Sequence, residues 1–439
     1  MALSWKEATA RQSVTAFLKA FISAGSLTLI EKDGTSLCFE GSLEICPLSV
    51  TLKVHDPQFY WKVAMEADLG FADAYINGDF SFVDKDKGLV NVMMIFLACT
   101  DYNSSSANVS KRNWWASVFS ITSWIGTAKF IYRHFRRRNT LTQARTNISQ
   151  HYDLSNEMFS YFMDETMLYS CAVFKSENED LEVAQMRKIS LLIDKARVKE
   201  HHEVLETGFG WGTLAIELVK RTGCKYTGIT LSQEQLKFAE ERVNKAGLQD
   251  RIRFLLCDYR QLKDVHKYDR IFSCEMLESV GHEYIEEYFR CCESFLAPNG
   301  LFVLQFISIA DECYDEFRKS PGFIKEYIFF GGCLPSFSRV TSAMATASRL
   351  CVEHVENIGD HYYQTIRLWR KNFLENQSKI ISLGFDEKFI RTWEYYFDYC
   401  AAGFKMRTLG DYQVIFSRKG NVVAFDDPYA IIPSARCLP

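Results

Sequence analysis

A glycine-rich loop follows a short apolar segment near the middle of the chain. The segment 203–207 has the length and composition of a buried strand, and Gly208, Gly210 and Gly212 come directly after it in the spacing G-x-G-x-G. Glycines let the backbone turn tightly and approach a ligand closely, while a following helix offers free N–H groups. A dinucleotide site needs a further glycine where this chain has Thr213. The spacing therefore favours S-adenosylmethionine, which has no pyrophosphate to hold.

Polar and aromatic residues follow the next four apolar segments, which are 225–230, 252–257, 270–274 and 300–307. Ligands of open α/β sheets bind at the carboxyl ends of the strands, so we expect these residues to surround one pocket. Those after the second strand would hold a ribose, and those after the third would hold an adenine. The set is Thr230, Leu231, Gln235, Asp258, Tyr259, Glu278, Gln305 and Ile307.

The elements that must position these residues alternate between strands and helices. Helical segments over 213–221, 232–246 and 283–296 separate the predicted strands, which indicates right-handed βαβ units and a mostly parallel sheet. We therefore expect an α/β fold of the Rossmann-like class I type that S-adenosylmethionine-dependent methyltransferases have. The first 100 residues contain short strands and helices of their own, which predicts a smaller N-terminal α+β domain.

Composition excludes several classes of protein. The 439 residues carry a net charge of −4, which is untypical of a nucleic-acid binder, and 47% of them are hydrophobic. The 14 cysteines include no C-x-x-C pair, so we predict no metal site and expect reduced thiols. The N-terminus lacks a signal-peptide core, and the apolar run at 92–99 is shorter than the roughly 20 residues that span a bilayer. We expect a cytoplasmic protein without a transmembrane segment.

The segment 102–152 differs in charge from the rest of the chain. It contains eight Lys and Arg residues and no Asp or Glu. A run of large aromatic residues within it is followed by Arg136, Arg137 and Arg138. Basic and aromatic residues together are typical of an interfacial helix, so we expect peripheral association with an anionic membrane. An interdomain connector with solvated arginines is the alternative.

Several motifs occur in a fixed order along the chain. They are HYDLSNEMF (151–159), LYSCA (168–172), VLETGFGWG (204–212), GITLS (228–232), SCEMLESVG (273–281), LQFIS (304–308), EHVENIG (353–359) and YCAAGF (399–404). On these motifs the chain resembles the cyclopropane-fatty-acyl-phospholipid synthases, particularly those of plants, and the related mycolic acid cyclopropane synthases. The resemblance extends from about residue 48 to residue 425.

The resemblance implies an arrangement of parts and a reaction. An N-terminal lipid-binding domain (1–105) would precede a basic aromatic linker (106–148), the methyltransferase domain (149–425) and a tail (426–439). The enzyme would add a methylene group from S-adenosylmethionine to a cis double bond of an unsaturated phospholipid. Besides the positions after the strands, the residues implied for the cofactor are Tyr169, Ser170, Glu206, Gly208, Gly210, Trp211 and Gly212.

The resemblance also implies a bound bicarbonate ion. Methyl transfer to an alkene produces a carbocation, and a base must then remove a proton from the added methyl so that the ring closes. The positions implied for holding bicarbonate are Cys171, Glu278, Gln305, Ile307 and Tyr362. Cys400 matches a cysteine usually regarded as catalytic in the family.

Some residues depart from the family pattern, and other functions remain open. Gln305 stands where most members have histidine, and Phe209 stands where a cysteine is expected. One alternative is N-methylation of a small amine, as in the coclaurine-type relatives. Another, suggested by Phe209 and Thr207, is a catalytically inactive lipid-binding homologue. A homodimer and an oxidase partner acting in trans also remain open, because plant relatives often carry an oxidase-like region.

Overall fold

The computed structural model describes residues 4–105, 139–152, 155–320, 322–425, 427 and 431–437. They form two compact units. The first contains the described residues within 1–136, 320–328 and 377–407, and the second contains the other described residues. Residues 106–138 of the basic aromatic linker lie outside the described residues. No helix of the described part of the chain is long and apolar enough to cross a bilayer.

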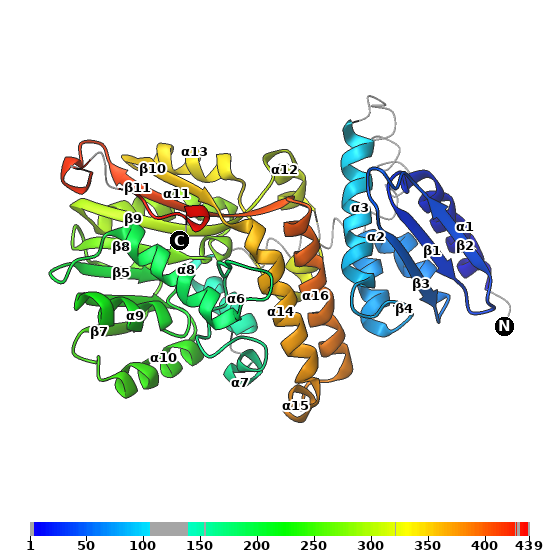
Figure 1. Cartoon of the computed structure of the whole chain (residues 1–439), viewed down its shortest axis with the longest axis horizontal. Coiled ribbons are helices and arrows are strands. Elements are labelled where there is room, and N and C mark those ends of the chain that lie inside the picture. The colour runs from blue at the N-terminus through cyan, green and yellow to red at the C-terminus, as the bar shows by residue number, and fades with distance from the viewer. Residues whose placement is uncertain are drawn as a thin grey trace. The chain divides into compact units, whose positions relative to one another are not determined.

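The first unit is built around a four-stranded sheet with the order β2-β1-β3-β4 (Figure 1). Strands β1 and β3 are parallel, while the pairs β1–β2 and β3–β4 are antiparallel. Its strands are β1 (Ser26–Ile30), β2 (Ser36–Glu40), β3 (Ser49–Val54) and β4 (Phe80–Phe82). Its helices are α1 (Trp5–Phe21), α2 (Gln58–Asn77), α3 (Gly88–Ser105), the π-turn η4 (Ile324–Ile328), α15 (Gln377–Ser382) and α16 (Glu387–Lys405).

Helix α16 belongs to this first unit although it lies late in the sequence. It packs against α2 and α3, and Tyr75 of α2 donates a hydrogen bond of 2.7 Å to Glu394 of α16. The predicted boundaries, which follow the chain linearly, place α16 in the methyltransferase domain. The compact units divide the chain differently, because an apolar helix face can be buried by any element that reaches it.

The second unit contains a seven-stranded sheet with the order β10-β11-β9-β8-β5-β6-β7. The pairs among β5 to β9 are parallel, and β11 runs antiparallel to both of its neighbours. The strands are β5 (Glu203–Thr207), β6 (Lys225–Thr230), β7 (Ile252–Leu256), β8 (Tyr268–Cys274), β9 (Leu296–Ile309), β10 (Leu350–Asn357) and β11 (Leu409–Arg418). This is the predicted class I methyltransferase topology.

Helices cover both faces of this sheet (Figure 1). In β9, Leu301 and Val303 join the core beneath α8 and α9, while Phe302 and Leu304 join the core beneath α11 and α13. This alternation is the two-residue period of a strand that is buried on both faces. The α-helices are α6 (Leu141–Tyr152), α7 (Asn156–Ser160), α8 (Leu181–Ala196), α9 (Thr213–Thr222), α10 (Gln233–Ala246), α11 (Ile285–Phe295), α12 (Asp311–Lys319), α13 (Phe337–Ala347) and α14 (Tyr362–Glu375). Short 3₁₀ turns are η1 (Tyr259–Gln261), η2 (Leu277–Ser279), η3 (His282–Tyr284), η5 (Gly359–His361), η6 (Val422–Ala424) and η7 (Ala435–Cys437).

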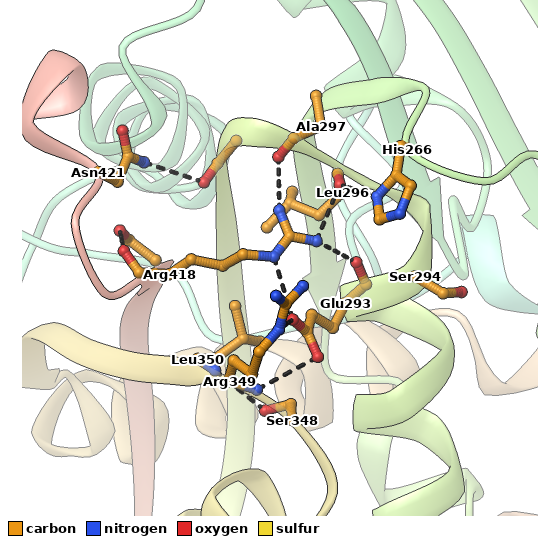
Figure 2. Close-up of polar contacts among 12 residues, drawn as sticks. His266, Glu293, Ser294, Leu296, Ala297, Ser348, Arg349, Leu350, Arg418 and Asn421 are labelled. Carbon is orange, nitrogen blue, oxygen red and sulfur yellow. Dashed lines mark hydrogen bonds and ion pairs between the residues drawn. The ribbon is translucent and has the colours of Figure 1, made fainter.

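Arg418 and Arg349, which we call the arginine clamp, both contact Glu293 of α11, as Figure 2 shows. Arg418, at the end of β11, donates to the Glu293 carboxylate at 3.0 Å and to the Ala297 carbonyl at 2.7 Å. It also reaches the carbonyls of Glu293 and Leu296, which lie at the C-terminus of α11. Arg349 donates to the same carboxylate at 2.8 Å. The clamp therefore satisfies the carbonyl groups that a helix end leaves without intrahelical partners.

Candidate active site

A pocket opens at the carboxyl ends of β5, β6, β7 and β8. Its volume is about 1140 Å³, which includes the part of the opening that is continuous with the solvent. The residues predicted to hold the cofactor line it, with the exception of Gly212, which is the N-cap of α9. They are Tyr169, Ser170, Glu206, Gly208, Gly210, Trp211, Thr230, Leu231, Gln235, Asp258 and Tyr259. The ends of these strands therefore surround one pocket, but Glu278, Gln305 and Ile307, which were expected in the same ring, are not among the residues that line it.

The glycine loop requires glycine for steric reasons. Gly208 has a φ of 80°, and a Cβ there would lie 2.8 Å from Cγ of Met276. Between the glycines, the ring of Phe209 stacks on Phe254 with the centroids 4.2 Å apart. Gly228 of β6 leaves room for this ring, because a Cβ at that position would lie 2.7 Å from it. The ring of Phe209 is therefore largely buried, and Phe209 is also one of the residues that line the pocket.

Neighbouring elements hold the cofactor-lining side chains in place. Trp211 donates from Nε1 to Oδ1 of Asn156 at 2.7 Å, which ties the loop to the motif at 151–159. Asp258 accepts two hydrogen bonds from the Arg260 guanidinium, at 2.8 and 2.7 Å. Burial raises the pKa of Glu206 to about 8, and a hydrogen bond from Tyr226 opposes the shift. A cationic ligand group would favour the ionised form of this carboxyl group, so the pocket suits a sulfonium amino acid attached to an adenosine.

A second cluster of side chains surrounds the carboxylate of Glu275, directly after β8. The backbone N–H of Cys171 donates to its Oε1 at 2.9 Å, and Nε2 of Gln305 donates to the same oxygen at 2.8 Å. The hydroxyl of Tyr362 donates to Oε2 at 2.5 Å. Three of the positions assigned to a bicarbonate ion therefore converge on one protein carboxylate.

Two further groups extend the cluster around Glu275. Gln305 uses its second Nε2 hydrogen on Oδ2 of Asp411 at 2.9 Å, and its Oε1 accepts from Gln413. Burial, together with the nearby charge of Glu275, raises the pKa of Asp411 well above its ordinary value. Lys188 supplies a nearby positive charge, and its Nζ donates to Oγ of Ser170 at 2.6 Å. The arrangement favours a protonated Asp411 next to an ionised Glu275.

Glu278 lies one turn further along the chain, in η2. Its Oε1 accepts the backbone N–H of Ile307, and its Oε2 is buried without a hydrogen-bond partner among the residues of the described ranges. Burial and the charge of Glu275 raise the pKa of Glu278 to about 8. Glu278 does not line the pocket, whereas Glu275 does. Glu278 therefore affects the pocket through its neighbours and not by lining it.

The predicted bicarbonate ion does not fit this arrangement. The N–H of Cys171, the hydroxyl of Tyr362 and both hydrogens of the Gln305 amide already donate to Glu275 or Asp411. The N–H of Ile307 donates to Glu278. An amide N–H or a hydroxyl has one hydrogen to donate, so these groups have none left for an ion.

Neither of the two predicted cysteines presents a reactive thiol to the pocket. Burial raises the pKa of the Cys171 thiol well above its ordinary value, and its Sγ donates to carbonyl oxygens. Cys400 is on α16 in the first unit, and burial raises the pKa of its thiol too. A raised thiol pKa is typical of a structural cysteine. Cys171 contributes its backbone N–H, and the pocket-lining residues do not include Cys400.

Sequence reasoning missed Glu275, Asp411 and Lys188. Glu275 had a usable signal, because it directly follows an apolar strand, as Asp258 does. Asp411 is an acidic residue within a predominantly apolar segment, which is a weaker signal. Lys188 lies on an amphipathic helix, where a lysine ordinarily faces the solvent, so nothing in its neighbours pointed to the site.

The fold, the glycine loop and the pocket define an S-adenosylmethionine-dependent methyltransferase. Residues 139–414 match the family model described as mycolic acid cyclopropane synthetase. The chain belongs to this family.

Relatives with known names support the assignment. The chain is 33% identical to the tuberculostearic acid methyltransferase of Mycobacterium tuberculosis over 90% of this chain and 88% of that protein. It is 31% identical to the cyclopropane-fatty-acyl-phospholipid synthase of Escherichia coli K12, over 84% of this chain and 87% of that protein. The structure is similar to that of a mycolic acid cyclopropane synthase complexed with S-adenosylhomocysteine and CTAB, with 29% identity and a TM-score of 0.58 over 62% of this chain and 98% of that one.

Proposed function

We propose that the chain adds one carbon from S-adenosylmethionine across a cis double bond of an unsaturated phospholipid acyl chain, forming a cyclopropane ring. The observation that carries the proposal is that Glu275 and Tyr169 line the same pocket as the glycine loop. A carboxylate and an aromatic ring are the two groups this reaction needs next to the methyl donor.

The glycine loop and the carboxyl ends of β6 and β7 would bind the cofactor, which supplies an electrophilic methyl group. An alkene is a weak nucleophile, so holding it in line with that methyl contributes most to the rate. The ring of Tyr169 packs against Trp369 at 5.2 Å and Phe159 at 5.5 Å between centroids. Of these three rings, that of Tyr169 lines the pocket. It would stabilise a carbocation on the acyl chain through its quadrupole and help to exclude water from it.

The alternatives make different predictions for the same pocket. An inactive homologue would not bind the cofactor. Phe209 and Thr207, which suggested this alternative, both line the pocket. Calorimetric titration with S-adenosylmethionine tests it, because the proposed function requires binding. A solved coclaurine N-methyltransferase structure covers 80% of this chain with a TM-score of 0.60, but at 18% identity it supports only the fold. The relative named for tuberculostearic acid supports a branched product as the second candidate.

Lipid analysis of cells that express the chain tests the proposal. Mass spectrometry should show unsaturated acyl chains heavier by one CH₂, and mild hydrogenation should leave the added unit as a ring. An exocyclic methylene has the same mass but takes up hydrogen at its double bond, so the two products separate. Unchanged lipids beside a methylated amine would contradict the proposal.

We also propose that the substrate is reached at an anionic membrane surface through the segment 111–138. The support is compositional, since tryptophans and phenylalanines are combined there with basic residues and no acidic ones. Each Lys or Arg near such a surface is worth about 1 kcal/mol. Replacing Arg136, Arg137 and Arg138 by Gln should therefore weaken co-sedimentation with vesicles that contain phosphatidylserine. Unchanged sedimentation would favour a connector.

A further inference from the structure

The backbone at Glu275 has a conformation that favours glycine. Its φ is 49°, in the left-handed region, where residues other than Gly, Asn and Asp are uncommon. A buried acidic side chain held in a strained conformation persists only where its surroundings impose it, and such residues cluster at active sites. The N–H of Glu275 donates to the Gln305 carbonyl at 2.8 Å, which fixes the strained turn to the end of β9.

Hydrogen bonds also fix the orientation of the Glu275 side chain. Donors from three separate elements bind its oxygens, namely the chain before α8, strand β9 and helix α14. Of the three neighbouring carboxyl groups at positions 275, 278 and 411, only that of Glu275 lines the pocket. The protein thus presents one fixed carboxylate to the ligand, and the other two lie outside the pocket lining.

We propose that Glu275 is the general base of the reaction and takes the place of a bicarbonate ion, an inference that rests on the proposed function. After methyl transfer, one former alkene carbon bears the new methyl and its neighbour bears the positive charge. The Glu275 carboxylate removes a proton from that methyl. The electron pair of the broken C–H bond forms the third C–C bond of the ring, and the proton stays on Glu275 until it is released to solvent.

The neighbouring groups suit this role. Gln305 is a neutral donor, so it orients the carboxylate without the added positive charge that would weaken it as a base. The positive charge of Lys188 favours the ionised form of Glu275, and burial together with the charge of Glu275 raises the pKa of Asp411. Burial raises the pKa of Glu275, which increases its basicity toward the methyl proton.

Turnover measured in buffer freed of carbon dioxide tests the inference. The wild-type rate should be the same with and without added bicarbonate. Glu275→Gln should lower turnover by about 10²–10⁴-fold, the usual contribution of a general base, while calorimetry shows unchanged cofactor binding. Glu275→Gly suits the left-handed φ and empties the carboxylate's place, so bicarbonate should restore at least a tenth of the lost rate.

A second measurement does not depend on activity. Bicarbonate should raise the Tm of the Glu275→Gly variant, because an ion that binds only the folded state stabilises it. It should leave the Tm of the wild type and of Glu275→Gln unchanged, since a side chain fills the place in both. A wild type that needs bicarbonate for turnover would overturn the inference, as would a Glu275→Gly variant whose rate and Tm do not respond to it. A wild type that modifies no lipid contradicts the proposed function instead, and the Tm measurement still reports on the ion's place.

Discussion

The two ends of strand β11 differ in how they balance buried charge. At one end, the carboxylate of Glu293 has two cationic partners, since it accepts hydrogen bonds from both Arg418 and Arg349 (Figure 2). At the other end, Asp411 lies in a cluster with Glu275 and Glu278. These three carboxyl groups have one nearby cationic side chain, that of Lys188, among the described residues. The Oε2 of Glu278 and Oδ1 of Asp411 have no hydrogen-bond partner within the part of the chain that the structure describes.

This difference separates stability from function within one sheet. The hydrogen bonds of Arg418 hold the end of α11 to β11, and Arg418 and Glu293 are not among the residues that line the pocket. Uncompensated carboxyl groups are costly to bury, so their presence at the strand ends that line a pocket indicates a chemical role. Changes at the cluster should therefore affect turnover, while changes at the clamp should affect unfolding.

Among the residues around Glu275, the largest effect is expected at Glu278. Glu278→Gln should lower turnover by more than roughly 100-fold, because it disturbs the carboxyl group that holds the Ile307 N–H and neighbours the base. Calorimetric titration should show nearly unchanged binding of S-adenosylmethionine. Lost cofactor binding would contradict a role outside the pocket lining.

A smaller loss is expected at Tyr362, which donates to Glu275 from α14. Tyr362→Phe removes that hydrogen bond but keeps the ring, so kcat should fall by about tenfold to 100-fold, as for a charge-assisted hydrogen bond. The KM for the lipid should stay the same, since the hydroxyl positions the base rather than the substrate. Steady-state kinetics with varied lipid separates the two parameters, and a change confined to KM would be incompatible with this role.

The clamp should respond in the opposite way. Arg418→Met should lower the free energy of unfolding by about 2 kcal/mol in urea titrations, because Arg418 is largely buried and bonds several acceptors. Arg349→Met is the matched control, and it should cost less than about 1 kcal/mol because its side chain is 74% exposed. Turnover per folded molecule should be unchanged in both. A loss of turnover in folded Arg418→Met would contradict the view that the clamp contributes to stability and the carboxyl cluster to turnover.

The last difference between the two ends is in the pH dependence of stability. Burial raises the pKa of Glu278 from 4.5 to about 8, so its contribution to stability is present below pH 4.5 and is lost as the pH rises through 8. Burial alone would raise the pKa of Glu293, but hydrogen bonds from Arg418 and Arg349 outweigh it and lower that pKa. Its contribution is present above 4.5 and is lost as the pH falls through the lowered value.

Unfolding curves of Glu278→Gln and Glu293→Gln across this range measure both contributions. Glu278→Gln should gain stability relative to the wild type as the pH rises from about 4.5 to 8. The neighbouring groups Glu275, Asp411 and Lys188 are present in both proteins, so the difference between the two curves reports on Glu278. The difference between Glu293→Gln and the wild type should shrink at acid pH. Parallel pH profiles for the two variants would show that the ends are electrostatically alike.

The sequence predicted what short-range patterns encode. Strand β5 occupies 203–207 as expected, because an apolar run before a glycine loop permits few other structures. The grouping of α16 with the N-terminal unit was not predictable, since it depends on contacts between distant segments. The same limit applies to Glu275, because its role follows from donors that the fold brings from three elements.

The most direct test of the account uses S-adenosylmethionine with a trideuterated methyl group and an unsaturated phospholipid. A base that removes one proton from the transferred methyl should leave two deuterium atoms in the product lipid, as mass spectrometry would show. Retention of all three, as in simple methylation, would contradict the account.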